Sequence, residues 1–252
     1  MFDPAAYGDA FADVYDDWYA GISDVEGTVD TVRRLAGGGP VLELGIGTGR
    51  LAIPLVDAGV EVHGVDASEA MVERLRAKPG GAGIPVLLAD ASERLPEVTG
   101  GYVVVLVAFN TFFNLTADGA QERCLELIAS RLRPEGKVVI EAFVPNDNLA
   151  ASGVDVTDVH ADEVRLSVFR HDVPTGVVLG SMVSISAAGV RLRPWAVRPR
   201  PPDQLDAMAA DAGFELESRH GGWRDEPFGD ESDRHVTVYR FAPSTFGAVK
   251  HS

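Results

Sequence analysis

Residues 40–49 read Pro-Val-Leu-Glu-Leu-Gly-Ile-Gly-Thr-Gly, a short apolar run interrupted by Glu43 and followed by three glycines at alternate positions. The apolar run predicts a buried strand, and the glycines allow the chain to turn sharply and bring its backbone against a ligand. Residues 50–58 then predict a helix, because Pro54 falls close enough to its start to be tolerated. A strand, a glycine turn and a helix N-terminus form a ligand site whatever the ligand is.

Strands and helices alternate from this stretch onward. Strands are expected at 41–44, 60–65, 85–88, 102–107 and 137–143, and helices at 50–58, 68–77 and 117–132. Runs rich in Val and Leu are typical of strands that helices cover on both faces, so the fold class is α/β with a doubly wound, mostly parallel sheet. Ligands of such sheets bind beyond the carboxyl ends of the strands, where the glycine turn should lie.

The chain divides into five regions. Residues 1–35 form an N-terminal helical lid, in which Phe11, Val14, Tyr15, Trp18 and Tyr19 follow the spacing of one helix with an aromatic face. Residues 36–143 form the ligand-binding core. Residues 144–201 form an inserted antiparallel β unit, because apolar or alternating runs at 164–169, 177–187 and 190–197 are separated by turn residues. Residues 202–242 close the sheet with a helix at 203–212 and strands at 214–219 and 236–241, and residues 243–252 form an exposed tail.

Composition excludes several classes of function. The net charge of −16 argues against a protein that grips nucleic acid, because such binding rests on clustered Lys and Arg. No apolar run approaches the length of a membrane span, and the first residues lack the features of a secretory signal, so a cytoplasmic protein is expected. A single cysteine, Cys124, permits neither an internal disulfide nor a multi-cysteine zinc site, and no metal is implied.

The spacing of the glycines separates two classes of ligand. A dinucleotide fingerprint requires G-x-G-x-x-G, but its third glycine would fall on Arg50, and Gly49 instead gives G-x-G-x-G. Glu43 is also foreign to that fingerprint, and its carboxylate could accept hydrogen bonds from an ammonium group above the turn. Asp66 ends the second strand, where it could take both hydroxyls of a ribose, and Asp90 ends the third, where it could accept from adenine N6.

The residues that carry these features resemble the class I S-adenosylmethionine-dependent methyltransferases. The resemblance rests on Glu43–Gly49, Asp66, Asp90-Ala91 and the segment 132–138, Leu-Arg-Pro-Glu-Gly-Lys-Val. It implies a seven-stranded Rossmann-like sheet and S-adenosylmethionine as the cofactor. The cofactor-binding residues that it implies, with the lid tyrosines included, are Tyr15, Tyr19, Glu43, Gly45, Gly47, Gly49, Asp66, Ala67, Met71, Asp90, Ala91 and Phe109. For Met71, ordinary packing of the helix is an equal alternative.

The acceptor is harder to infer. The segment Tyr15–Tyr19 and the insertion together resemble small-molecule methyltransferases, including the amino-sugar N-methyltransferases and the glycine N-methyltransferase group. That resemblance implies a small-molecule, natural-product-like acceptor, places Tyr19 near the transferred methyl group, and gives the insertion a part in the acceptor pocket or in a homodimer contact.

An amine acceptor needs only to arrive neutral, whereas an oxygen acceptor commonly needs a base. The candidate bases are His63, His160, His171, His220 and His235. If the strand at 214–219 is parallel to its sheet, the loop after it opens on the ligand side. We therefore expect His235 as a catalytic candidate beside Tyr19, and Asn110, His220 and Trp223 as substrate contacts. A nicotinamide-dependent oxidoreductase is disfavoured by the glycine spacing, and a non-catalytic adenosylmethionine-binding protein stays open.

Overall fold

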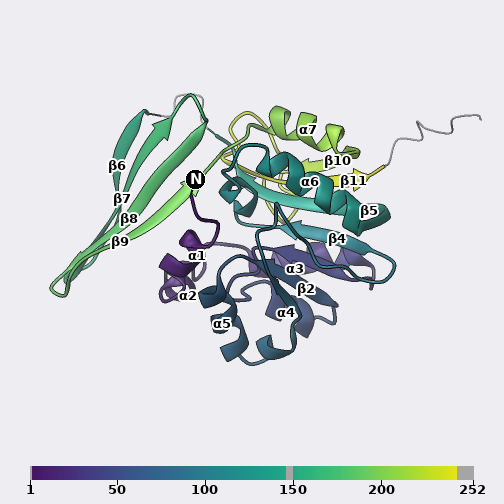
Figure 1. Cartoon of the computed structure of the whole chain (residues 1–252), viewed down its shortest axis with the longest axis horizontal. Helices are drawn as coiled ribbons and strands as arrows, with labels where there is room; N and C mark the ends of the chain where they lie inside the picture. The colour runs from purple at the N-terminus through teal and green to yellow at the C-terminus, as the bar shows by residue number, and fades with distance from the viewer. Residues whose placement is uncertain (1, 146–149, 243–252) are drawn as a thin grey trace, which may run out of the picture.

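The computed structural model describes residues 2–145 and 150–242 and contains two separate β-sheets (Figure 1). The larger sheet has seven strands in the order β10-β11-β5-β4-β1-β2-β3. Its strands are β1 (Val41–Leu44), β2 (Val62–Asp66), β3 (Val86–Leu88), β4 (Tyr102–Val107), β5 (Leu132–Phe143), β10 (Phe214–His220) and β11 (Arg234–Phe241). Only β11 runs against its neighbours, β5 and β10. The prediction of a mostly parallel, doubly wound sheet is therefore confirmed.

Helices cover both faces of this sheet. One face packs against α3 (Val25–Ala36), α4 (Ala52–Asp57) and the C-terminal part of α5 (Glu69–Ala77), and the other packs against α6 (Ala120–Arg131) and α7 (Pro202–Asp211). Strand β4 lies between the two layers and is buried along its whole length, as its run Tyr-Val-Val-Val-Leu-Val predicts. Two short 3₁₀ helices, η1 (Gly81–Gly83) and η2 (Thr111–Asn114), complete the connections.

The strand order places the ligand crevice. From β1 the chain builds outward through β2 to β3, and then crosses back to place β4 on the other side of β1. The connections on the two sides of β1 leave a crevice at the carboxyl ends of β1 and β4, which is where ligands bind in sheets of this kind. The glycine turn directly follows β1 and so lies in that crevice.

Of the predicted lid, residues 1–35, α3 packs on the sheet, so from here on the lid means the described residues before α3. The lid contains two short helices, so the prediction of a single helix with an aromatic face is wrong. Helix α1 (Ala6–Phe11) ends before α2 (Tyr15–Trp18), and the residues between them form a turn. The turn carries Asp13, which pairs with Arg193 of the second sheet, and it folds Trp18 back to an edge-to-face contact with Phe11, with ring centres 6.1 Å apart. Tertiary contacts therefore override the helical period of the sequence.

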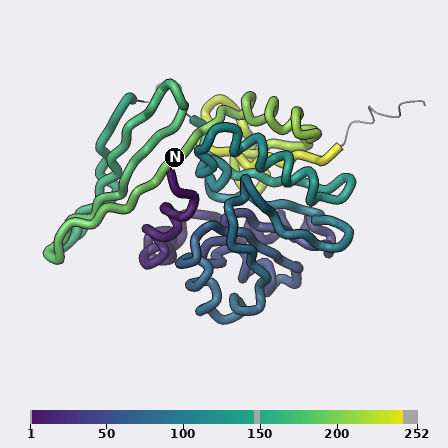
Figure 2. The backbone as a smooth tube through the Cα atoms, viewed as in Figure 1, coloured from purple at the N-terminus to yellow at the C-terminus, as the bar shows by residue number. Residues whose placement is uncertain are grey.

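The insertion forms the second sheet, in which β6 (Ser152–Val159), β7 (Glu163–Asp172), β8 (Val177–Ser186) and β9 (Gly189–Val197) are joined in order and all antiparallel. It projects from the body of the molecule beside the lid (Figure 2). The antiparallel insertion is confirmed, although β6 was not expected from the sequence. The predicted tail at 243–252 lies outside the described residues. No helix within the described ranges is long and apolar enough to cross a membrane.

Candidate functional site

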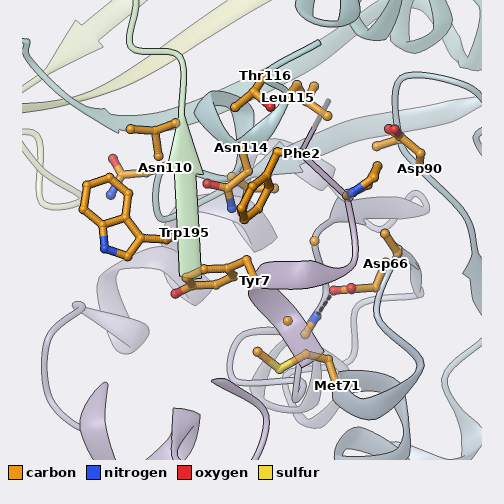
Figure 3. Close-up of a pocket in the computed structure, with 18 of the residues that line it drawn as sticks. Phe2, Tyr7, Asp66, Met71, Asp90, Asn110, Asn114, Leu115, Thr116 and Trp195 are labelled. Carbon is orange, nitrogen blue, oxygen red and sulfur yellow. Dashed lines mark hydrogen bonds between the residues drawn. The ribbon is translucent and has the colours of Figure 1, made fainter. Parts of the chain in front are cut away.

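A cavity of about 580 Å³ lies in the crevice beneath the lid. Its walls come from the glycine turn, the ends of β2, β3 and β4, helix α1, and the inner face of the second sheet. In Figure 3, Asp66 and Asp90 lie on one side, Trp195 and Asn110 on the other, and Phe2 and Tyr7 of the lid lie between them. The cavity therefore has an acidic end and an aromatic end, and it is large enough for a ligand of drug size.

The three glycines of the turn all have left-handed backbone, with φ of 66° at Gly45, 55° at Gly47 and 80° at Gly49. Other residues adopt this conformation at a cost, which explains the choice of glycine. Gly49 also lies against α5, because a Cβ there would approach Leu75 Cδ1 to 2.2 Å. Gly47 lines the cavity and has no such neighbour, so its backbone is open to a ligand.

The two acids at the strand ends are held by backbone donors. Asp66 Oδ2 accepts a hydrogen bond from Gly47 N (2.8 Å) and Oδ1 accepts one from Ser68 N (2.8 Å), so the acid also ties the glycine turn to the start of α5. Burial raises the pKa of Asp66, while these backbone hydrogen bonds oppose the rise. Asp90 Oδ1 accepts from Ser92 N (2.8 Å) and both residues line the cavity. Each carboxylate oxygen keeps a further lone pair for a ligand hydroxyl or amino group.

Beneath the glycine turn, two buried polar atoms, one hydrogen-bond acceptor and one donor, have no hydrogen-bond partner within the described residues. They are Glu43 Oε2 and Arg50 Nε. Burial raises the pKa of Glu43 to about 8, although the charge of Arg50 opposes the rise. The guanidinium of Arg50 donates to Ser23 Oγ and lies 4.9 Å from the ring centre of Phe109. Buried polar groups are rarely left unpaired, so these two atoms are candidates for contact with charged groups of a ligand.

Three tyrosines of the lid, Tyr7, Tyr15 and Tyr19, form a cluster over the cavity, which we call the tyrosine cluster. Tyr7 OH donates to Tyr19 OH at 3.3 Å, and the rings of Tyr15 and Tyr19 lie 4.7 Å apart. Burial raises the pKa of all three hydroxyls, that of Tyr15 to about 12. The cluster is therefore uncharged near neutral pH. Tyr7 was not singled out from the sequence, although its spacing of four from Phe11, on which it stacks, was a usable signal.

The loop after β4 has a strained backbone. Phe109 and Asn110 are consecutive residues other than glycine with positive φ, 52° and 64°. Buried Glu141 accepts from Phe109 N (2.9 Å), and Asn110 Oδ1 accepts from Phe143 N (2.7 Å), so β5 fixes both residues in this conformation. Such strain persists where the surroundings enforce it, and it gathers at functional sites. No short motif marked Glu141, because its partner is 32 residues away.

The aromatic end of the cavity is a surface that we call the acceptor wall. Its members come from the β4 loop, the end of β5 and the second sheet: Asn110, Phe143, Ser167, Met182, Trp195 and Val197. None of the six has an ionisable side chain. Of these six, only Asn110 was predicted as a substrate contact; the insertion was expected to take part in the acceptor pocket or in a homodimer contact, but none of its residues was singled out.

The lid is attached to both sheets. Gly8 allows α1 to lie directly on the start of α5, because a Cβ at Gly8 would meet Ser68 Cβ at 2.4 Å. Ser68 Oγ donates to Asp9 Oδ1 at 2.6 Å. On the other side, buried Arg193 donates to Asp13 Oδ1 (2.6 Å) and to the backbone oxygen of Ala10, which keeps the pKa of Asp13 below its usual range.

The structure brings most of the predicted site residues to the cavity. The predicted residues that line it are Tyr15, Tyr19, Gly45, Gly47, Asp66, Ala67, Met71, Asp90, Ala91, Phe109 and Asn110. Glu43 and Gly49 lie behind this lining. The side chain of Met71 is buried against Phe11 of the lid, so it both packs and lines the cavity.

Three predicted residues lie away from the cavity. Strand β10 forms the outer edge of the sheet, so the loop after it covers α3 and does not reach the crevice. Trp223 is buried in this loop, and its backbone oxygen accepts a hydrogen bond from Thr31 Oγ1. His220 stands at the end of the same strand, 3.8 Å from Asp225. His235 is fully buried on β11, where its Nδ1 lies 2.8 Å from Thr237 Oγ1 and burial lowers its pKa to about 4. The prediction that these residues contact the ligand is therefore wrong. It took account of the direction of the strand before the loop but not of the place of that strand at the edge of the sheet.

Comparison with known proteins adds three findings. A family described as a methyltransferase domain matches residues 41–136. A Streptomyces cypemycin N-terminal methyltransferase is 30% identical over 94% of this chain and 98% of its own length. The structure of the CcbJ methyltransferase from Streptomyces caelestis has a TM-score of 0.89 and 37% identity, and covers 96% of this chain and 100% of that one.

A more distant structure shares the fold. It is CalS10 with bound S-adenosylmethionine, an amino pentose methyltransferase from Micromonospora echinaspora, with a TM-score of 0.69 and 18% identity over 91% of this chain and 97% of that one.

Proposed function

The chain belongs to the S-adenosylmethionine-dependent methyltransferases, and we propose that it methylates an amine nitrogen of a small, natural-product-like molecule. As a member of this family it transfers the methyl group of S-adenosylmethionine to a small-molecule acceptor. The oxidoreductase and the non-catalytic binding protein, both considered from the sequence, are set aside by this membership. What the family does not specify is the acceptor atom.

The acidic end of the cavity fits the cofactor. We assign the ribose hydroxyls to Asp66 and the adenine to Asp90 and Ala91, because these lie at neighbouring strand ends with free acceptor lone pairs. We assign the amino-acid end to Glu43 and Arg50, whose unpaired buried atoms match an ammonium and a carboxylate. When bound, the cofactor supplies an electrophilic methyl group on a sulfonium.

The observation that carries the choice of nitrogen is the acceptor wall, which has no ionisable side chain. An alcohol must lose its proton as it attacks, and a base within hydrogen-bonding reach is the usual means. A neutral amine already presents its lone pair and needs only to be held in line in a pocket that excludes water. An apolar wall with a few hydrogen-bonding groups, such as Asn110 Nδ2 and Ser167, orients an acceptor and removes no proton.

The tyrosine cluster supports the same choice. Its hydroxyls have raised pKa values, so they are poor bases near neutral pH but good neutral hydrogen-bond partners. We propose that Tyr19 positions the acceptor nitrogen, and that the three rings exclude water above it. His235, the other catalytic candidate from the sequence, is buried elsewhere on β11.

The test is a comparison of matched acceptors. Labelled S-adenosylmethionine is incubated with the protein and with pairs that differ only in the acceptor atom, such as an amino sugar and its parent hydroxyl sugar, or a short peptide and its analogue with an N-terminal 2-hydroxy acid. We expect label on the amine member only, with kcat/KM rising with pH as the amine loses its proton. A phenol or alcohol methylated as well as its amine partner would refute the choice of nitrogen.

Two further proposals concern the setting of the reaction. We propose that the protein acts in the cytoplasm, where its cofactor is made, which fractionation of the native cells would check. We also propose that it acts as a homodimer, as expected from the resemblance of its insertion to that of small-molecule methyltransferases.

A further inference from the structure

Trp195 of the acceptor wall lies over a glycine of the neighbouring strand. Trp195 on β9 is paired with Gly180 on β8, and residues paired in this way point to the same face of a sheet. A Cβ at Gly180 would overlap two atoms of the indole, Cζ2 and Cε2. The indole therefore rests on the backbone of β8, and Figure 3 shows it extending sideways from its strand.

Space for the indole is the reason for this glycine. The backbone at Gly180 is not left-handed, so its conformation is open to any residue. Glycine within a strand weakens the strand, and it often marks a position that another group approaches closely. At Gly180 the approaching group is the indole, followed by the backbone oxygen of Val168, 2.7 Å from the place of a Cβ. An alanine at this position would therefore displace Trp195.

The indole is held on more than one side. One face lies on β8, and the side chain also packs against a buried cluster that contains Phe11 of the lid. Arg193 and Val197 flank it along β9 on the same face of the sheet. The cavity is the side that leaves room, because Trp195 lines it. Added volume at Gly180 would therefore push the indole into the cavity, where we place the acceptor.

The face of the indole that is turned away from β8 is a flat, apolar surface beside the cavity. A ring laid against such a surface makes more contact than an open chain of the same size. The other members of the acceptor wall carry no ionisable side chain that would select an acceptor by its charge. The shape of the acceptor therefore decides how well this end of the cavity holds it.

We propose that Gly180 is a positioning residue that sets the acceptor preference of the enzyme through Trp195. By leaving room for the indole on β8, Gly180 keeps the cavity deep and turns the face of the indole towards it, where the ring of a cyclic acceptor stacks. This inference rests on the proposed function only in placing the acceptor at the acceptor wall. It holds whichever atom of the acceptor is methylated.

Fluorine NMR of the full chain labelled with fluorotryptophan tests the position of the indole directly. The chain has three tryptophans, Trp18, Trp195 and Trp223, and the signal of Trp195 is the one that W195F removes. Cyclohexylamine and n-hexylamine, which have the same number of carbons and the same charge, are titrated into the complex with S-adenosylhomocysteine. We expect cyclohexylamine to shift the Trp195 signal at millimolar concentration and to bind about fivefold more tightly than n-hexylamine.

Alanine at two matched glycines separates the role of Gly180 from a general effect on the sheet. G180A should shift the Trp195 signal before any amine is added and should lose the preference for the cyclic amine, while the dissociation constant for S-adenosylhomocysteine stays within about twofold. The control is G153A, because Gly153 of β6 is paired with Phe169 of β7 and a Cβ there would meet the Phe169 ring at 2.6 Å. Phe169 lies outside the lining of the cavity, so G153A should change neither the Trp195 signal nor the preference.

Three results would overturn the role of Gly180: cyclohexylamine leaves the Trp195 signal of the wild type unmoved, G180A keeps either the wild-type signal or the preference, or G153A loses the preference as G180A does. W195L covers the case in which G180A does not fold. It keeps Gly180 but lacks the indole, so it should lose the preference, and a preserved preference would refute the stacking. Amine binding is measured without methyl transfer, so a failure of the proposed N-methylation is detected separately by the labelling test.

Discussion

Substitution of Glu43 by Gln should make the protein more stable at high pH and worse at binding its cofactor. Burial raises the pKa of Glu43 from the usual 4.5 to about 8. Below about pH 4.5 the carboxyl is protonated in both the folded and the unfolded state, so it contributes no pH dependence. Between these values the unfolded state gives up the proton and the folded state keeps it, so the free energy of unfolding falls as pH rises, and it levels off above about pH 8.

The size of the effect follows from the width of this interval. It spans roughly 3.5 pH units, and each unit corresponds to 1.36 kcal/mol, so ionisation of Glu43 costs at most about 5 kcal/mol. Glutamine carries no charge but leaves an amide incompletely hydrogen-bonded, at a cost of about 1–3 kcal/mol. The free energy of unfolding of E43Q should therefore be equal to or below that of the wild type near pH 5, and about 2–4 kcal/mol above it near pH 9.

The assay is urea unfolding of the cofactor-free protein at several pH values from 5 to 9. The control is E73Q, the same change at an exposed position of α5, which should alter the free energy of unfolding by no more than about 0.5 kcal/mol at any pH. Calorimetry with S-adenosylhomocysteine near pH 8.5 should show E43Q binding at least about tenfold more weakly, since the ligand ammonium loses a charged partner. If the free energy of unfolding depends on pH in the same way in the wild type and in E43Q, the raised pKa of Glu43 is refuted. If E43Q binds S-adenosylhomocysteine as tightly as the wild type, the role of Glu43 in binding is refuted.

Three further substitutions test other parts of the site. D66N keeps the size of the side chain but removes its charge and one acceptor, so the dissociation constant for S-adenosylhomocysteine should rise about 10- to 100-fold; equal affinity would contradict the ribose assignment. G8V places a side chain where a Cβ already meets Ser68 at 2.4 Å, so turnover should fall at least about tenfold, whereas G229V, with open space around it, should retain activity; equal losses would refute a role of Gly8 in the packing of α1 on α5. Y19F removes a neutral hydroxyl, so kcat should fall about tenfold with no change in the shape of its pH profile; a lost ionisation would show that Tyr19 acts as a base.

The cofactor half of the site was predictable because its residues follow strands in chain order. The parallel strands β1, β2 and β3 all end at the same edge of the sheet. Gly45, Asp66 and Asp90 each stand at the end of one of these strands, so they lie close together in space. The glycines carried a second signal, since the left-handed backbone that they require is what the turn has. Arg50 was seen only as an interruption of a dinucleotide motif, and its buried side chain was not foreseen.

The loop after β10 shows where this reasoning fails. His220 and Trp223 do follow a strand that runs parallel to β5, yet β10 lies at the sheet edge, on the far side of β11. Strand direction can be inferred from the order of elements, but the lateral position of a strand depends on which neighbour it pairs with, and local sequence does not encode that choice. The same limit applies to Glu141, which acts on the backbone of Phe109 from a different strand.

The residues of the acceptor wall could not be predicted for a different reason. The same reason indicates which substitutions would change the acceptor preference of the enzyme. The residues of the wall alternate along β7–β9 with residues that point to the opposite face of the second sheet, so Trp195 faces the cavity while its neighbour Pro194 faces away from it. Polarity does alternate along these strands, but the apolar positions point away from the cavity, while the cavity-side face also carries Arg165 and Arg193, so alternation alone would have pointed to the wrong face. A substitution at Ser167, Met182 or Trp195 can therefore reshape the acceptor wall without altering either the opposite face of the second sheet or the acids that we assign to the cofactor. Acceptor preference should be adjustable at these three residues while affinity for S-adenosylhomocysteine stays constant, because among residues 2–145 and 150–242 no hydrogen bond that positions Asp66, Asp90 or Gly47 passes through the second sheet.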